Sequence, residues 1–107
     1  MDSWRRAIMW ATDVNLDALA RHAAEKSWPE SRVRVRQLDV RDAGAWEDQV
    51  REAASAFGRV DVLMNVAGYL WADKCHETSA EAVHLSLDIN AKGVFFGTQA
   101  AARPMLR

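Results

Sequence analysis

The hydrophobic and polar residues of this 107-residue chain follow a pattern that predicts three strands, each followed by a helix. Residues Arg6–Thr12 form a short apolar run, as expected for a buried strand. Residues Val33–Leu38 alternate apolar and polar side chains, which predicts a strand with one buried face at a sheet edge. In Val60–Val66 the only charge is Asp61, and such runs are typical of strands buried on both faces of a parallel sheet.

Apolar residues at helical spacing predict the first two helices. The first covers Asn15–Lys26 and must end before Pro29, because the residue before a proline is pushed away from helical angles. The second begins after Asp42, a suitable N-cap, and runs to Phe57. Gly58 then stands where a left-handed C-cap is expected.

The third helix is predicted over Ser79–Leu106. Thr78 and Glu81 have the spacing of a capping box at its start. An irregularity is expected near Asn90–Gly93, and Pro104 should weaken the last turns. The strand–helix alternation predicts an α/β fold: a partial Rossmann-type, doubly wound parallel sheet of three βα units, in one domain over residues 1–107.

Composition excludes several classes of function. The net charge of -1 predicts no nucleic-acid or anionic-membrane partner, and no apolar run approaches the roughly 20 residues of a membrane span. Cys75 is the only cysteine, so we expect no internal disulfide and a reducing, cytoplasmic location. No metal site is expected, because Cys75 and His76 have no second ligand cluster in the chain.

Two acidic positions follow predicted strands and could contact a nucleotide. Asp13 could accept hydrogen bonds from both hydroxyls of an adenosine ribose, and it would repel a 2′-phosphate, which favours NAD over NADP. The alternative is a helix-entry cap formed by Asp13 or Asn15. Asp39 could accept a hydrogen bond from the adenine amino group, with the backbone of Val40 lining the pocket; the alternative is a turn-forming aspartate.

A third candidate is the small-residue turn Asn65-Val66-Ala67-Gly68, which would let a ligand approach the backbone at the carboxyl end of a strand. Asn65 could also tie neighbouring strands together. Asn90 lies inside a helical pattern although asparagine is a poor helix former. A break in the helix there would leave a backbone carbonyl free to hold a water. The alternative is a local kink with no chemical role. Gly93 and Gly97 predict close packing of a helix.

Together these segments resemble the classical short-chain dehydrogenase/reductase family, from about Ala7 to Leu106. The resemblance is carried by Leu38-Asp39-Val40, by Phe57 to Gly68, and by Leu87 to Phe95. It implies an NAD(P)-binding domain and an oxidoreductase that moves a hydride between a nicotinamide cofactor and a small alcohol or carbonyl substrate.

The resemblance also implies roles for single residues. Asp13 matches the acidic residue that reads the ribose in NAD-preferring members, and Asp39 and Val40 match the adenine-pocket pair. Asn65, Ala67 and Gly68 match the family's Asn-Asn-Ala-Gly motif, with Val66 in place of its second asparagine. Asn90 matches the catalytic helix asparagine that holds a proton-relay water.

The departures from the family pattern are equally specific. The chain contains no Gly-x-x-x-Gly-x-Gly, so we expect weak or absent cofactor binding. Its one tyrosine, Tyr69, has Asp73 four positions on and Lys74 five, so Tyr-x-x-x-Lys is absent and the family's catalytic serine would follow Arg107. We therefore expect no turnover by this chain, which we interpret as a central fragment of the family.

Two other interpretations remain open. In the first, the chain is a non-catalytic interaction module completed by strand pairing with a partner or itself, and its last helix, with Gly93 and Gly97, forms an oligomer contact. In the second, it is the product of a truncated reading frame. In both, the Ala7–Thr12 and Val60–Val66 strands are expected to pair with each other or to leave unpaired edges.

Overall fold

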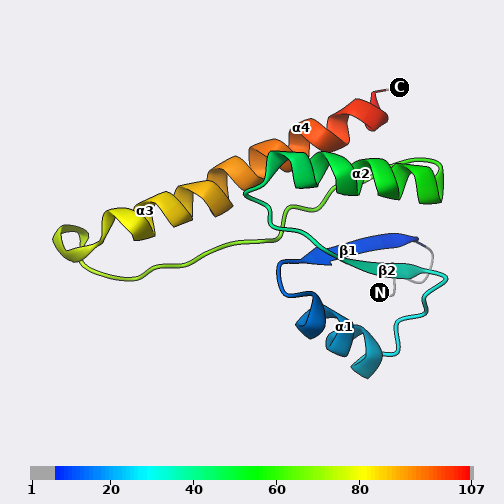
Figure 1. Ribbon diagram of the computed structural model, residues 1–107, viewed down its shortest axis with the longest axis horizontal. Helices are drawn as coiled ribbons and strands as arrows, with labels where there is room; N and C mark the ends of the chain where they lie inside the picture. Colours follow the sequence, from blue (N-terminus) through cyan, green and yellow to red (C-terminus); the bar gives the residue numbers. More distant parts are fainter. Residues whose placement is uncertain (1–6, 107) are drawn as a thin grey trace.

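The computed structural model describes residues 7–106, which form an α/β arrangement around a short parallel sheet. Strand β1 (Met9–Asp13) pairs in parallel with β2 (Val33–Gln37), in a register that runs from Met9 opposite Val33 to Asp13 opposite Gln37. Helix α1 (Leu16–Glu25) lies on one side of the sheet, and helices α2 (Ala43–Phe57) and α4 (Gly93–Met105) lie on the other (Figure 1). The predicted fold class is confirmed.

Side-chain caps determine where the first two helices begin. Asn15 caps α1, because its Oδ1 accepts a hydrogen bond from the backbone of Ala18 at 3.0 Å. Asp42 caps α2 in the same way, through Ala45 at 3.0 Å. Gly58 has φ of 85°, the left-handed conformation that ends α2 without a Cβ clash. All three positions agree with the sequence prediction.

The core lies between the chain that leaves β2 and the two helices above it. Its buried members are Leu38, Trp46 and Ala100, with 3%, 7% and 5% of their surfaces exposed. Partly buried side chains complete it: Val40, Ala45, Val50, Leu63 and Phe96. Helix α2 is therefore held through Trp46 on one face of the sheet, while none of the α1 residues is buried.

The predicted third strand is wrong for this structure. Residues 60–66 run without regular secondary structure, and Val62, Met64 and Val66 are 76%, 74% and 78% exposed. Two outcomes were open for this segment, pairing with the first strand or an unpaired edge. Among residues 7–106 the structure shows the second, because the sheet contains β1 and β2 alone. A strand needs a neighbour about 4.8 Å away to satisfy its backbone, and the apolar pattern does not itself supply one.

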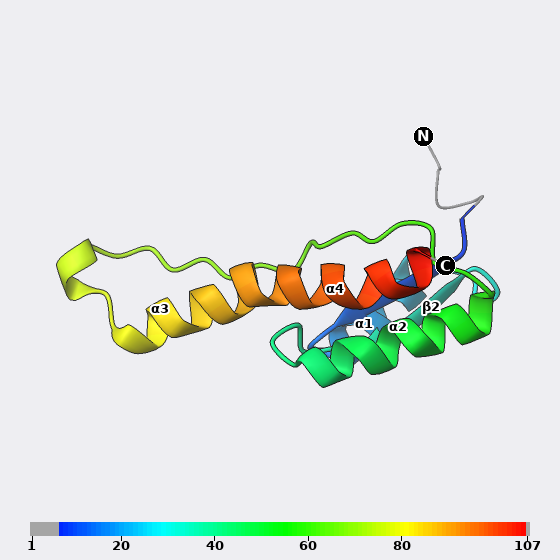
Figure 2. The same ribbon diagram turned by 90° about the horizontal axis from the view of Figure 1, so that it is seen from above.

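The predicted last helix is continuous, and two α-helical parts are joined by a π-helical turn (Figure 2). Helix α3 (Ala80–Leu87) continues through a π-helical turn, η3 (Asp88–Lys92), into α4. The irregularity expected near Asn90 is thus confirmed as a π turn, in which the Gly93 N–H donates to the Asp88 carbonyl.

The predicted cap of this helix is one residue off. Ser79 is the N-cap, and its Oγ accepts from the backbone of Ala82 at 3.1 Å. The Thr78 hydroxyl instead donates to the Lys74 carbonyl at 2.9 Å, so it closes the preceding 3-10 turn, η2 (Cys75–Glu77). Among residues 7–106, no helix combines the length and apolar character needed to cross a bilayer.

Candidate functional site

Asp13 lies at the carboxyl end of β1, where the chain turns into α1. Its Oδ1 accepts a hydrogen bond from the backbone N–H of Asn15 at 2.9 Å, while Asn15 itself caps the helix. The side chain is exposed, and its backbone carbonyl accepts from Leu38 N–H at 3.0 Å. Asp13 therefore lies at the same sheet end as Asp39, the residue that follows Leu38.

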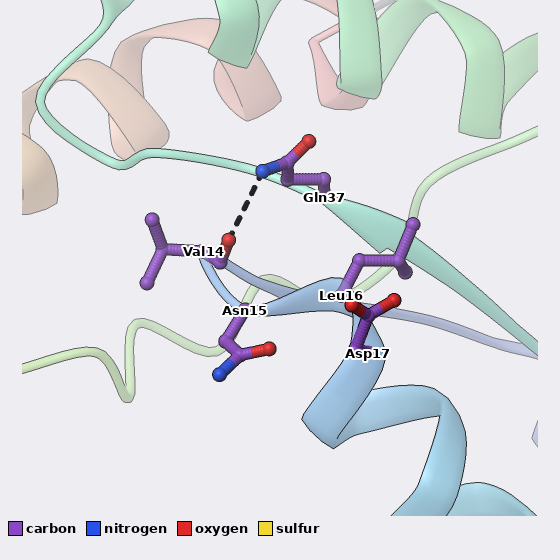
Figure 3. Close-up of a pocket in the computed structure, with 5 residues that line it drawn as sticks. All are labelled: Val14, Asn15, Leu16, Asp17 and Gln37. Atoms are coloured by element: carbon purple, nitrogen blue, oxygen red, sulfur yellow. Dashed lines mark hydrogen bonds between the residues drawn. The ribbon is translucent and has the colours of Figure 1, made fainter.

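A shallow pocket opens at the turn between β1 and α1, directly after Asp13 in the chain (Figure 3). Its volume is about 520 Å³. The lining residues are Val14, Asn15, Leu16, Asp17 and Gln37. The Gln37 amide donates to the Val14 carbonyl at 3.1 Å and so ties the end of β2 to the turn before α1. Polar groups and two aliphatic side chains thus surround a space next to the predicted ribose-reading carboxylate.

The carboxylate of Asp39 is held by Arg41. Arg41 Nη2 donates to Oδ2 at 2.6 Å, Nε donates to Oδ1 at 2.9 Å, and the Arg41 backbone N–H reaches Oδ1 at 3.0 Å. The Arg41 side-chain hydrogen bond is the main cause that lowers the pKa of Asp39 below its ordinary 3.8; the Arg41 backbone N–H and charge act in the same direction. The carboxylate is therefore ionised at neutral pH and fixed in orientation.

The backbone of Val40 is fixed from the helix side. Its carbonyl accepts a hydrogen bond from the indole Nε1 of Trp46 at 3.0 Å. Its side chain faces Gly93 at the start of α4, where a Cβ added to the glycine would stand 2.9 Å from Val40 Cγ2. The Asp39–Val40 turn is consequently packed between α2 and α4.

The turn from Asn65 to Gly68 rests on the long helix. Asn65 Nδ2 lies 3.5 Å from Thr98 Oγ1, a long contact to α4 in place of the expected tie between strands. Ala67 is exposed beside it. At Gly68 a Cβ would lie 3.6 Å from Asn90 Oδ1, so this turn and the π turn are adjacent.

Asn90 makes a two-point contact with the residue after this turn. Its Nδ2 donates to the Tyr69 carbonyl at 2.8 Å, and the Tyr69 N–H donates to its Oδ1 at 2.8 Å. Both backbone groups of Tyr69 are thus satisfied by one side chain. The structure brings Asn90 and Gly68 together and places Val40 against the same helix. Asp39 is held by Arg41 beside Val40, and Asp13 lies at the neighbouring strand end.

Three contacts of this region were not predicted from the sequence. Arg41 could have been suspected, because a basic residue two positions from Asp39 can reach back to its carboxylate. Trp46 lies on the buried face of α2, and a buried indole N–H usually requires an acceptor. The pairing with the Tyr69 backbone has no local signal, since Tyr69 and Asn90 are 21 residues apart.

The fold is an α/β arrangement of the Rossmann type, a class of fold in which ligands bind at the carboxyl ends of the parallel strands. The profile of the family described as "short chain dehydrogenase" matches residues 5–107. The chain belongs to the short-chain dehydrogenase family.

Individual relatives support the assignment. The chain is 35% identical over 92 residues to a probable 2,4-dienoyl-CoA reductase of Bacillus subtilis, covering 86% of this chain and 36% of the relative. It is 31% identical over 96 residues to the D-threitol dehydrogenase of Mycolicibacterium smegmatis, covering 90% and 37%. The chain therefore spans just over a third of the length of these relatives.

Solved structures agree with the fold. A short-chain dehydrogenase/reductase described as glucose/ribitol dehydrogenase from Brucella melitensis superposes with a TM-score of 0.85 at 31% identity, over 92% of this chain and 41% of that one. The NADP-bound structure of ElxO superposes with a TM-score of 0.82 at 27% identity, over 90% and 39%.

Proposed function

We propose that these residues form the adenosine-reading side and the relay asparagine of an NAD-linked alcohol/carbonyl oxidoreductase. The observation that carries the proposal is Asn90, held by two 2.8 Å hydrogen bonds against Tyr69 and next to Gly68, in a π turn of the long helix. Family membership gives that arrangement its meaning: the asparagine of the family motif stands beside the family's Asn-x-Ala-Gly turn.

Asp13 is proposed to set the cofactor preference. An ionised carboxylate offers about four acceptor sites, of which the Asn15 N–H uses one, so both ribose hydroxyls can be accepted. A 2′-phosphate would bring like charge to the same place, which favours NAD. ElxO has NADP bound, so structural similarity alone does not fix the preference.

Asp39 and Val40 are proposed to line the adenine pocket. Arg41 keeps the Asp39 carboxylate ionised and oriented, and the Trp46 indole fixes the Val40 carbonyl. These residues fit the adenosine half of the cofactor. For the diphosphate, the 107 residues contain no glycine-rich turn, so we expect weak binding by this chain.

The bound nicotinamide would supply or accept the hydride. In this chain, Asn90 would position a proton-relay water through its backbone carbonyl, since its side-chain amide is occupied by Tyr69 and the π turn interrupts the regular hydrogen-bond ladder. Relatives named D-threitol dehydrogenase and cyclopentanol dehydrogenase suggest a small alcohol or its carbonyl as substrate. Because Tyr-x-x-x-Lys is absent, we propose that the chain by itself has no turnover. A cytoplasmic location is proposed from the single cysteine.

The test is an NMR titration of the isotope-labelled chain with NADH and with NADPH. We expect NADH to shift the amides of residues 13–17 and 39–41, and NADPH to bind more weakly. Asp13→Asn should remove the difference between the two, whereas Asp17→Asn, which changes the acid that lines the neighbouring pocket, should keep it. Equal or tighter binding of NADPH to the unaltered chain, or NADH-induced shifts that leave residues 13–17 and 39–41 unaffected, would refute the proposed site.

A second candidate function is an interaction module completed by strand pairing. It is favoured by the exposed apolar side chains of Val62, Met64 and Val66 and by the two-stranded sheet. The predicted oligomer contact through Gly93 and Gly97 is not available, because both glycines pack inside the chain. A contact would instead use exposed Leu87 and Phe95. Size-exclusion chromatography with light scattering tests this candidate, and a folded, stable monomer would count against it.

A further inference from the structure

Helix α4 packs closely against neighbouring residues at two glycines, Gly93 and Gly97, which are one helical turn apart. Gly93 and Gly97 are both buried. A Cβ on Gly93 would lie 2.9 Å from Val40 Cγ2, 3.1 Å from its Cβ and 3.2 Å from its carbonyl oxygen. A Cβ on Gly97 would lie 2.7 Å from two ring atoms of Trp46. The separations of 2.7 and 2.9 Å are shorter than carbon atoms tolerate, so a side chain at either position requires the helix or the facing Val40 or Trp46 side chain to shift.

The neighbours at this contact belong to the candidate site. Val40 is part of the predicted adenine turn, and its carbonyl is bonded to the Trp46 indole at 3.0 Å. Asn65 enters from the other side, since a Cβ on Gly97 would also stand 2.8 Å from Asn65 Oδ1. The Val40 turn, Trp46 of α2 and Asn65, all distant from α4 in the sequence, therefore meet this helix within about one turn.

The same long helix holds Asn90 in the π turn directly before α4. Asn90 reaches Tyr69 only if the helix lies at its observed height above the turn that ends at Gly68. A glycine inside a helix is ordinarily unfavourable. Two of them at the contact with Val40 and Trp46 are explained by the close approach rather than by helix formation.

We propose that Gly93 and Gly97 are positioning residues. They allow the long helix to approach Val40 and Trp46 closely, and this position of the helix also holds Asn90 against Tyr69. A change at the Asp39–Val40 turn is thereby expected to alter the Gly68–Tyr69 turn. A displacement at one turn is transmitted to the other, because the continuous helix formed by η3 and α4 contacts both turns. The functional meaning of this coupling rests on the proposed function, whereas the contacts themselves do not.

The test is hydrogen exchange of the chain without cofactor, read by NMR at two protons. One is the Trp46 indole N–H, which reports the Val40 turn; the other is the Tyr69 amide, which reports the contact with Asn90. We expect Gly93→Ala to accelerate both by roughly 5- to 30-fold, the change in opening equilibrium that overpacking by one methyl produces. Gly97→Ala should act in the same direction.

The matched control is Gly44→Ala on α2, where the nearest atom to an added Cβ is Asp42 Oδ1 at 3.4 Å. It should accelerate exchange at neither proton, because alanine fits there and is also the better helix former. Val40→Ala combined with Gly93→Ala removes the 2.9 Å contact and should restore part of the protection.

If Gly93→Ala does not fold, the Val40→Ala variant alone tests the coupling, because it removes side-chain atoms of Val40 from the contact with Gly93. Faster exchange at Tyr69 supports the coupling. Faster exchange confined to Trp46, in either variant, would overturn it. Since no cofactor is present, these outcomes are independent of whether NAD binds.

Discussion

Replacing Asn90 with alanine removes both hydrogen bonds that hold the backbone of Tyr69. The Asn90 amide is the donor to the Tyr69 carbonyl and the acceptor from its N–H, each at 2.8 Å. Alanine keeps the helix backbone and takes away only this contact. The variant therefore isolates the link between the π turn and the turn that ends at Gly68.

The expected loss of stability follows from three terms. Two hydrogen bonds contribute about 1 kcal/mol each, and their exposure to solvent places them at the lower end of that range. Alanine is the better helix former, which returns about 0.5 kcal/mol. We therefore expect the Asn90→Ala chain to be less stable by about 1 kcal/mol, a difference that shifts the folding equilibrium roughly fivefold.

Urea unfolding followed by tryptophan fluorescence measures this difference. Gln99→Ala, at an exposed position of α4, is the matched control and should be neutral or slightly stabilising. If Asn90→Ala were as stable as the unaltered chain, or more stable, the two hydrogen bonds would have no energetic role. The assigned link between the helix and the turn would then be wrong.

Three further predictions concern the Val40 turn. Trp46→Phe deprives the Val40 carbonyl of its donor and should cost about 1–3 kcal/mol in urea unfolding, and an unchanged midpoint would contradict the bond. Asp42→Ala removes the N-cap of α2 and should cost about 1 kcal/mol in thermal unfolding; no loss would count against the cap. Because the pKa of Asp39 is lowered, its pair with Arg41 stabilises the fold above pH 3.8, and that stabilisation is lost as pH falls through the lowered pKa. Arg41→Gln should therefore raise the pKa of Asp39 in an NMR titration, and an unshifted pKa would refute the pairing. The difference in stability between this variant and the unaltered chain should become smaller in acid.

The elements that sequence patterns predicted well are those whose signals are local. The caps Asn15 and Asp42, the C-cap Gly58 and the irregularity at Asn90 depend on residues within one or two turns of themselves. Helix α2 was predicted from its apolar spacing, and Trp46 and Ala53 are its buried members. Such features can be predicted from the sequence because they depend on the geometry of neighbouring residues alone.

The misassigned features depend on partners elsewhere in the chain. Val60–Val66 has the composition of a buried strand, yet a strand exists only with a neighbour, and among residues 7–106 no strand lies hydrogen-bonded beside this segment. The contacts of Asn90 with Tyr69 and of Gly93 with Val40 join residues far apart in the sequence. A residue pattern indicates that such a position is special, but only the packing of the long helix shows what it touches.

The most direct test is an assay of the 107-residue chain for NAD-linked oxidation of a panel of small alcohols. The central claim is that these residues read adenosine and position a relay water, while the proton-donating tyrosine and its lysine are not among them. We predict no NADH formation above that of the chain without alcohol. Sustained NADH formation by the unaltered chain with any alcohol of the panel would contradict this claim, because catalysis would then proceed without Tyr-x-x-x-Lys.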